Sequence, residues 1–419
     1  MQGDLNSLLN RKLGDELDRR EFLKLSATTA AALGLAACGG GNGGAGAPSA
    51  PTGKDFKVGV VLPYSGTYQD LGDSITKGMK LYFSKAGNQA SNRKIVILQE
   101  DEAAGDTSIP LNKTRKLVEQ DGVDMIAGIV ASPNAVAVRG YIDQNQVPTL
   151  IANAGANALS RAAKSPWLYR TSFSNWQPSQ PMGKVLNDAG IKKLTLVYSN
   201  YGAGIETAAA IKETYGSQVV AEVKPPFPNT SGDFSPYITQ INQSRPDGIY
   251  VFMSGQDAIA FLKQAAQTMD KSIKVYGSGF FVEQDVLGAI GSAAPVGAIT
   301  GLHWALTLDN KENQQFTADF KKTFNKTADV FAVQGYDTAR VIVDALIAVK
   351  GKTDDKQAFM NAIAQVAFKS PRGPFRFDSH SNNVVQTVYV RQLINDPQLG
   401  YTNKVVSSVP NVTDPGPAQ

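Results

Sequence analysis

The stretch FKVGVVL, Phe56–Leu62, is a short and almost continuous apolar run that predicts a buried β-strand. A segment of helical period follows at residues 74–85, and a second β-branched run comes at residues 94–99. Strands that alternate with helices in this way indicate βαβ units and a parallel sheet. Such apolar strands are expected where helices cover both faces of the sheet.

The alternation runs through the first half of the chain and then starts again. Near residues 169–181 the rhythm breaks into a polar passage with Trp and Pro, which we interpret as a crossing into a second lobe. A chain of 419 residues suits two such lobes better than one core. The further expected elements of the first series are helices at 108–120 and 135–144 and strands at 125–129 and 148–152. The expected strands of the second series are 193–198, 219–223, 248–252, 274–276 and 297–302.

The C-terminal quarter predicts a return to the first lobe. Amphipathic helices are expected at 332–349 and 357–366, and an alternating, hairpin-like pair at 373–377 and 384–393 is expected to close the second lobe. The expected fold class is therefore α/β, with two lobes on parallel sheets. The expected boundaries are 55–174 with 332–370 for the first lobe, 175–331 with 371–410 for the second, and 411–419 for a tail.

The N-terminus predicts export. Arg19-Arg20 precedes Phe22-Leu23-Lys24 and a mildly apolar, Ala-rich run at 25–37, which is the order of a signal peptide over residues 1–37. The paired arginines resemble the twin-arginine motif, although Asp18 stands where Ser or Thr is usual, so the general secretory route stays open. The run is too short and too poor in large apolar residues to span a bilayer.

The sequence Leu35-Ala36-Ala37-Cys38 looks like a bacterial lipobox, in which Cys38 becomes the lipidated N-terminus. The alternative is a buried or spare thiol. Two or three acyl chains would hold the protein on a membrane face, and this anchor is the only membrane contact that we expect. Residues 38–54 are rich in Gly and Ala and predict a flexible tether. Cys38 is the only cysteine, which excludes a disulfide framework.

Composition argues against several functional classes. The net charge is only +4 and no dense basic cluster contains aromatic residues, so nucleic acid is not an expected partner. His303 and His380 are the only histidines, and neither stands in a metal-binding or catalytic pattern. We therefore expect no enzyme, no catalytic residues, no metal and no cofactor, with His303 as a hydrogen-bonded structural residue. The acidic run at 100–102 is expected to be a solvated loop.

Candidate binding residues follow the predicted strands, because ligands of open parallel sheets sit at the carboxyl ends of the strands. Ser65 follows the first strand, Ser132 the third, and the small residues Asn153, Ala154 and Gly155 the fourth. The Ser132 hydroxyl could bind a ligand carboxylate, whereas the alternative is that Ser65, Ser132 and Asn134 only cap helices. Tyr201 follows a strand of the second lobe, and its ring could form a pocket wall, as could those of Trp176, Phe280 and Phe281.

Several stretches in order resemble the branched-chain amino acid family of ABC-transporter solute-binding proteins. They are Val58-Gly59-Val60, Pro63-Tyr64-Ser65-Gly66, Val147-Pro148, Tyr169-Arg170-Thr171, Tyr201-Gly202-Ala203-Gly204, Gln334-Gly335-Tyr336-Asp337 and Arg372-Gly373-Pro374-Phe375-Arg376-Phe377. The resemblance covers nearly all of residues 57–393. It implies two Rossmann-like lobes joined by three hinge crossovers, the type I periplasmic-binding fold, which close on a small-molecule ligand. It also implies ABC permease subunits as partners, and we expect a monomer at the outer face of the cytoplasmic membrane.

By position, the resemblance implies that Ser132 and residues 153–155 receive the ligand's acid group and that Tyr201 covers it. Amino-acid binders also place an acidic side chain on the ligand ammonium, but the matching stretch, Gly277-Ser278-Gly279-Phe280, contains none. Asp257 or Glu283 could substitute. Gly155 falls where those binders often have Thr. Two ligands therefore stay open: a branched-chain or related amino acid, and an aromatic or aliphatic carboxylate without an amine.

Two other functional classes share parts of this pattern. A ligand sensor that docks on a membrane receptor would have the same fold and cleft. An exported enzyme fits the twin-arginine motif, but the scarcity of His and Cys argues against it.

Overall fold

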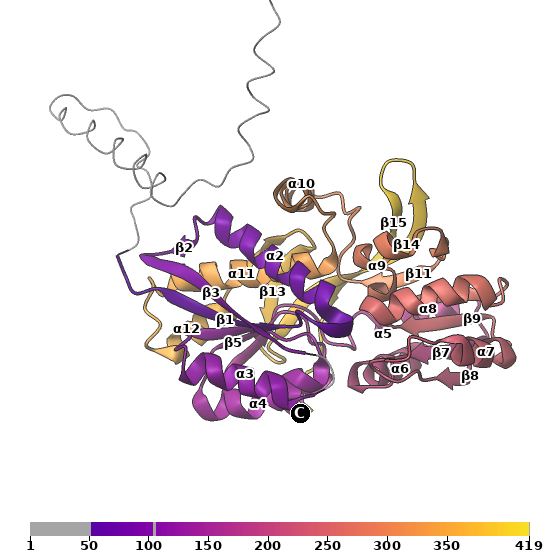
Figure 1. The fold of residues 1–419 in the computed structure, drawn as a ribbon, viewed down its shortest axis with the longest axis horizontal. Helices are drawn as coiled ribbons and strands as arrows, with labels where there is room; N and C mark the ends of the chain where they lie inside the picture. The colour runs from indigo at the N-terminus through magenta and orange to yellow at the C-terminus, as the bar shows by residue number, and fades with distance from the viewer. Residues whose placement is uncertain (1–51, 104–105, 419) are drawn as a thin grey trace, which may run out of the picture. The chain divides into compact units, whose positions relative to one another are not determined.

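The computed structural model of the protein describes residues 52–103 and 106–418. The expected signal peptide, Cys38 and nearly all of the expected tether lie outside the described residues. Residues 50–419 form one compact unit, whose fold is shown in Figure 1.

A parallel sheet forms the centre of the first lobe. Its strands, in sheet order, are β3 (Arg93–Asp101), β1 (Phe56–Leu62), β4 (Met125–Gly128), β5 (Thr149–Ile151) and β6 (Leu168–Arg170). The short β2 (Gln89–Ala90) pairs antiparallel with β3 at the edge. The four strands expected in this lobe are confirmed. The sequence analysis missed β6, because three residues that include Arg170 are too few for a strand pattern.

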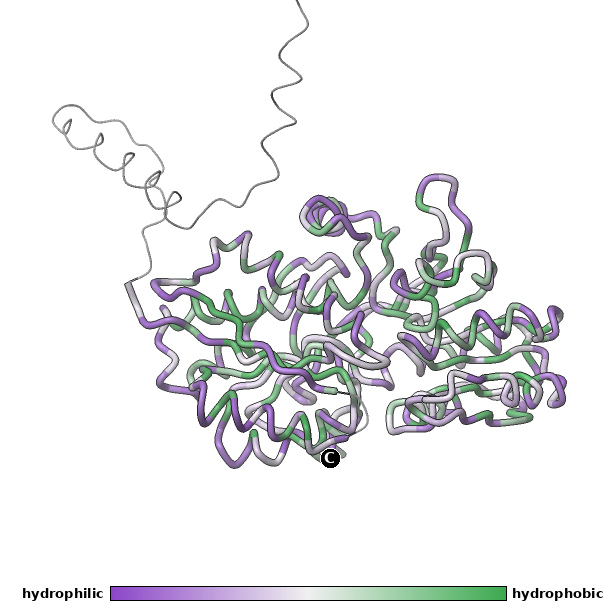
Figure 2. The backbone as a smooth tube through the Cα atoms, viewed as in Figure 1, coloured by the Kyte–Doolittle hydropathy of each residue, from purple (hydrophilic) through white to green (hydrophobic). Residues whose placement is uncertain are grey.

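A second parallel sheet forms the centre of the second lobe. Its order is β8 (Gln218–Val223), β7 (Lys193–Tyr198), β9 (Gly248–Phe252), β10 (Lys274–Ser278) and β11 (Ile299–Leu302). All five expected strands are confirmed. Figure 2 shows that the strands inside both lobes are predominantly hydrophobic, while the surface helices are mixed.

Helices cover both faces of each sheet. In the first lobe, apolar residues of α3 and α4 pack on one face, and those of α2, α11 and α12 pack on the other. The helices are α2 (Gln69–Lys85), α3 (Ser108–Glu119), α4 (Ser132–Asn145), α5 (Gln180–Asp188), α6 (Gly202–Thr214), α7 (Ser235–Ser244), α8 (Gly255–Thr268), α9 (Gln284–Ile290), α10 (Lys311–Phe324), α11 (Val330–Ala348) and α12 (Lys356–Ala364). This layering is why the strands are apolar on both sides.

Helices α2 and α11 approach closely through two glycines. A Cβ atom at Gly78 would lie 2.0 Å from the Ala332 carbonyl oxygen, and one at Gly335 would lie 1.9 Å from that of Ile75. A larger residue at either position would push the helices apart.

The C-terminal strands correct one expectation. Strand β13 (Gly373–Asp378) pairs with β12 (Ala367–Ser370) and with the start of β14 (Asn383–Asp396), where Asn383 lies opposite Arg170 of β6. The pair therefore begins on the sheet of the first lobe, and only the continuation of β14 joins β11 of the second lobe. The alternating pattern identified the strands correctly but carried no information about the sheet that they join.

Strand β15 (Gly400–Val412) was not expected. It pairs antiparallel with β14 as an edge strand, and its side chains are mostly exposed. Polar residues and Pro410 hide the strand pattern, since an edge strand has no buried face to mark it. Beyond β15 the expected tail returns to the first lobe, where buried Asp414 forms an ion pair with Arg161.

Three crossings join the lobes: after β6, between β11 and α11, and within β14. Buried Arg372 lies where they meet. Its guanidinium donates to Asp337 of α11 at 2.8 Å, to the Ser172 carbonyl at 2.9 Å and to Gln386 of β14 at 2.9 Å. Each crossing thus has a hydrogen bond to the same side chain.

Helix α10 packs against α2 and β12, so the chain has returned to the first lobe before residue 332, where we expected the boundary. The Phe316 ring lies 5.0 Å from that of Tyr336 in α11. In the described part of the chain, no helix combines the length and apolar character needed to cross a membrane.

Candidate functional site

A small cavity lies at the carboxyl ends of the strands of both lobes. Its volume is about 20 Å³, which leaves room for about one water molecule. The lobes therefore lie close together around it. The residues that line it are Tyr68, Leu71, Val130, Ser132, Asn153, Gly155, Phe173, Asn175, Tyr201, Ala203, Phe252, Ser254, Phe280 and Phe331.

Five of the expected binding residues meet at this cavity: Ser132, Asn153, Gly155, Tyr201 and Phe280. The other three do not line it. Ser65 is exposed and donates to Asp101 at 2.7 Å. Ala154 is buried behind the cavity, where its N–H donates to the Ile129 carbonyl. Asp257 is treated below with the acidic residues.

The first lobe presents backbone donors to the cavity. No hydrogen bond found within the described residues uses the N–H groups of Ser132, Asn153 or Gly155. Ser132 is also the first residue of α4, where the helix dipole favours an anion. These donors, together with the Ser132 hydroxyl, can bind a carboxylate.

The alternative helix-capping role does not hold. The N-cap of α4 is Ala131, and no side chain caps this helix. Ser65 precedes the short 3-10 helix η1 (Gly66–Tyr68) without a capping bond, and Asn134 donates instead to Glu102 at 3.0 Å.

Glu102 contradicts the expectation of a solvated acidic loop. It is buried, and its carboxylate accepts from the N–H groups of Val130 and Ala131, both at 2.7 Å. Burial raises the pKa of Glu102 to about 7, although these bonds oppose the rise. The carboxyl group thus lies directly beside the N-terminal end of α4. Its neighbours Glu100 and Asp101 lie in β3, so this run is not a loop.

The absence of Thr at position 155 has a steric cause. A Cβ atom on Gly155 would lie 2.2 Å from the Asn175 Oδ1 atom and 2.6 Å from the Phe173 ring. A side chain there would displace two residues that line the cavity.

None of the described residues that line the cavity is acidic. Glu283 is buried in an ion pair with Arg391, whose Nη1 atom lies 2.8 Å from the Glu283 Oε2 atom. Arg391 also donates to the Gly279 carbonyl, and a Cβ atom on Gly279 would lie 2.3 Å from the Arg391 Nη2 atom. A guanidinium therefore occupies the space that an acidic side chain at position 279 would need.

Asp257 lies in the first turn of α8 and accepts from the Asn229 N–H at 3.3 Å. Burial raises its pKa to about 6. It does not line the cavity, so neither expected substitute for the missing acid does.

Aromatic rings from both lobes form the walls. The Phe173 ring lies 4.8 Å from that of Phe280, which lies 5.8 Å from that of Phe331. Sequence reasoning missed Tyr68, Phe173 and Phe331. Phe173 follows β6, the strand that was also missed, while nothing in the sequence near Phe331 indicates a binding role.

His303 is a structural residue, as expected. Its Nε2 atom lies 3.2 Å from the Gln334 amide nitrogen, and Gln334 accepts from Asn153 at 2.7 Å. Its ring stacks on Phe173 at 5.5 Å between centroids. Burial and the nearby guanidinium groups of Arg372 and Arg391 lower its pKa well below the usual value. His303 is therefore neutral and supports the wall from behind.

Two sets of hydrogen bonds join the lobes at the cavity. The hydroxyl groups of Tyr68 and Tyr201 lie 2.9 Å apart. Glu206 of α6 accepts from the Asn175 side chain at 2.7 Å and from the Asn157 N–H at 2.9 Å. These bonds hold the lobes in a closed arrangement.

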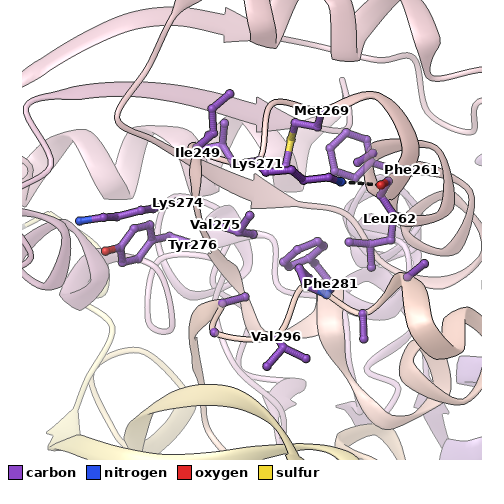
Figure 3. Close-up of a pocket in the computed structure, with 18 of the residues that line it drawn as sticks. Ile249, Phe261, Leu262, Met269, Lys271, Lys274, Val275, Tyr276, Phe281 and Val296 are labelled. Atoms are coloured by element: carbon purple, nitrogen blue, oxygen red, sulfur yellow. Dashed lines mark hydrogen bonds between the residues drawn. The ribbon is translucent and has the colours of Figure 1, made fainter.

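A larger cavity of about 480 Å³ lies at the opposite, amino-terminal ends of β9, β10 and β11 (Figure 3). Apolar side chains such as Phe261, Phe281 and Val296 line it. Ligands of parallel sheets bind at the carboxyl ends of strands, so the smaller cavity is the candidate site. Phe281 thus does not form a wall of that site, and neither does Trp176, which donates to Glu213 at 2.6 Å.

Comparisons with known proteins find a matching family model and a similar relative. A family model described as periplasmic binding protein matches residues 55–398. The chain is 31% identical to a Leu/Ile/Val-binding protein homolog 6 of Brucella melitensis biotype 1, over 86% of this chain and 93% of the relative.

Two solved structures are also similar. One is an ABC-transporter solute-binding protein from R. palustris in complex with benzoate, with a TM-score of 0.81 and 34% identity over 86% of this chain and 98% of the other. The other is a solute-binding protein from Rhodopseudomonas palustris BisB5 in complex with 3,4-dihydroxybenzoic acid, with a TM-score of 0.81 and 30% identity over 86% and 99%.

Proposed function

This chain belongs to the periplasmic binding protein family as a solute-binding protein of an ABC transporter, and on that premise we propose that its ligand is an aromatic carboxylate. One observation carries the proposal. Among the described residues, the cavity offers three backbone N–H groups for which no hydrogen-bond partner is found and walls of phenylalanine, but no acidic side chain that lines it.

The missing acid argues against an amino acid. An α-ammonium buried without a partner costs several kcal/mol, whereas a carboxylate without an amine avoids this penalty. Phe173, Phe280 and Phe331 suit a flat apolar ring, which stacks on or packs edge-on against such walls. The benzoate and dihydroxybenzoate complexes of two similar proteins support the same ligand class.

A branched-chain amino acid is the second candidate. The name of the Leu/Ile/Val-binding homologue favours it. In that case a carboxyl such as that of Asp257 would have to turn toward the cavity.

Binding and closure are coupled in the mechanism that we propose. The lobes open about the three crossings, since a cavity of about 20 Å³ has no room for an aromatic ring, and the ligand-bound form closes around a wider cavity than the one described. The ligand carboxylate binds the donors of the first lobe, and Tyr201 and Phe280 of the second lobe then close over the ring. The observed free energy of binding is the free energy of the ligand contacts in the closed form, reduced by the free energy needed to close the lobes. The closed form signals occupancy to the permease.

Export and anchoring complete the proposal. The N-terminal residues direct export, Cys38 carries the lipid, and residues 38–54 tether a monomeric body to the outer face of the cytoplasmic membrane. The ligand leaves chemically unchanged, so the protein is not an enzyme. A sensor for a membrane receptor is the alternative, and genes for permease and ATPase subunits beside this one would decide for import.

Calorimetry with benzoate and leucine tests the ligand. We expect benzoate to bind tightly and leucine to bind at least about 100-fold more weakly, since an unpaired ammonium costs several kcal/mol. A Ser132→Ala protein should lose benzoate affinity, while Ser84→Ala on α2 provides a matched control away from the cavity. Tight leucine binding would overturn the proposal. Mass spectrometry of the released benzoate tests the absence of turnover.

A further inference from the structure

The tyrosine pair adds two further polar groups to the lining of the cavity. Tyr68 comes from the first lobe and Tyr201 from the second, and their hydroxyl oxygens lie 2.9 Å apart. Both rings pack against Phe227, with centroid distances of 5.1 and 4.2 Å. This stacking fixes the position of both hydroxyl groups. Ser254 lines the same cavity beside them.

The pair has unused hydrogen-bonding capacity. Two phenol groups provide two hydrogens and four acceptor sites, and their mutual bond uses one hydrogen and one acceptor site. Burial raises the pKa of Tyr68 and of Tyr201 above the usual value for tyrosine, so both stay protonated at neutral pH. Ser254 also forms a hydrogen bond with Tyr68, so the three hydroxyl groups together leave one O–H donor and several acceptor sites for a ligand.

The charge near the pair opposes a carboxylate. Asp257 acts on both tyrosines, and its carboxylate helps to raise the pKa of each. The N–H groups of Ser132, Asn153 and Gly155 favour an anion instead. Glu102 lies beside these N–H groups, but with a pKa of about 7 it can take up a proton when a carboxylate binds. A carboxylate ligand is therefore oriented with its acid group at these N–H groups.

We propose that Tyr68 and Tyr201 select an aromatic carboxylate whose ring carries a hydroxyl group away from the acid group. The ligand hydroxyl inserts at the tyrosine pair, donates to one phenol oxygen and accepts from the free O–H. This inference rests on the proposed function and specifies its ligand. A benzoate ring without a hydroxyl group leaves this O–H donor and these acceptor sites without a ligand partner, so it binds more weakly.

The alternative is that the pair only holds the lobes closed. A closure bond acts on every ligand equally, because it changes the free energy of the closed form and not a ligand contact. A contact with the ligand hydroxyl acts only on hydroxylated ligands. The ratio of two affinities therefore separates the two roles.

Calorimetry with benzoate and with 3-hydroxy-, 4-hydroxy- and 3,4-dihydroxybenzoate tests the proposal. We expect the best hydroxylated ligand to bind at least about tenfold more tightly than benzoate. In Tyr201→Phe and in Tyr68→Phe this ratio should fall towards one, and both variants keep the ring that packs on Phe227. The matched control is Tyr141→Phe, because the Tyr141 hydroxyl donates to Glu119, far from the cavity. This variant should keep the ratio.

Three results would overturn the inference. Equal affinity for benzoate and all hydroxylated acids in the unaltered protein would refute it while leaving the proposed function intact. A loss of affinity in Tyr201→Phe that is the same for all four ligands would assign the pair to closure only. Binding of leucine but of none of the four acids would refute the proposed function, and this inference with it.

Discussion

A Cβ atom on Gly155 would lie 2.2 Å from the Oδ1 atom of Asn175. The two segments are held at this distance by the Asn175 N–H, which donates to the Gly155 carbonyl at 2.7 Å, and Asn175 is fixed further by its bond to Glu206. The anion-binding loop and the first crossing between the lobes are thus in direct contact, and only glycine fits between them.

Replacement of Gly155 should therefore impair binding. We expect Gly155→Ala to lower benzoate affinity by about tenfold and Gly155→Thr by more, because the added atoms displace Asn175 and Phe173. Titration calorimetry measures the loss. Gly140→Ala on α4 is the control, since a Cβ atom there meets no other atom within 4 Å and alanine favours a helix. Unchanged affinity in Gly155→Thr would contradict this account of the loop.

Glu206→Gln should weaken closure. The Glu206 Oε2 atom accepts one hydrogen bond from Asn157 of the first lobe and one from Asn175 of the first crossing, and the variant loses the charge that strengthens them. We expect benzoate affinity to fall several-fold and ligand-induced compaction to need more ligand, as seen by small-angle scattering. Glu213→Gln on the same helix is the control, because that carboxylate is exposed and accepts from Trp176 but from no residue of the first lobe among the hydrogen bonds of the described residues. An identical response of the two variants would argue against a closing role for Glu206.

Most strands could be predicted from the sequence, but the strands with which they pair could be predicted only in part. Buried runs such as Phe56–Leu62 carry their own signal, because both faces of the strand are covered. Strand β15 carries none, since its side chains are mostly exposed at a sheet edge. The alternation of β13 and β14 predicted a pair, but the sheet that they join is decided by contacts with Arg170 and Leu302, far away in sequence.

The sequence predicted those residues of the site that directly follow a strand. Ser132, Asn153 and Gly155 follow strands of one sheet, so the rule for carboxyl ends found them. Tyr68 and Phe331 reach the cavity only through the packing of whole elements, which no local pattern encodes. Glu102 belongs to an acidic run that is usually solvated, and only the structure shows that its carboxylate is buried against α4.

Removal of the thiol of Cys38 should release the protein from membranes. In Cys38→Ser no acyl chain can attach, and the residues described here contain no helix able to span a bilayer. Cell fractionation should then find the protein in the soluble exported fraction instead of the membrane fraction. Ser49→Ala in the expected tether serves as the control. Membrane retention of Cys38→Ser would show that another anchor exists.

The protein should be more stable at pH 6 than at pH 8. Burial raises the pKa of Asp329 to about 7, and the nearby Glu283 adds to the rise. A carboxyl with a raised pKa stabilises the fold at low pH, and this contribution is lost as pH rises through 7. For this residue alone the change is about 1 kcal/mol, measurable by thermal unfolding. In Asp329→Asn, which can still cap α11, the difference should shrink. An equal pH dependence in the variant would contradict the assignment.

Ligand affinity should fall as pH rises through about 7, because of Glu102. Its carboxyl group, with a pKa raised to about 7, binds the N–H groups of Val130 and Ala131 next to the donors that we assign to the ligand. A bound carboxylate raises this pKa further by repulsion, so binding takes up a proton above pH 7. We expect benzoate affinity to be several-fold higher at pH 6 than at pH 8.

Calorimetry in buffers of different ionisation enthalpy measures the proton uptake. Glu102→Gln has no charge to repel the ligand, so its affinity should stay constant across this range. Proton uptake that persists in the variant would assign the effect to another group.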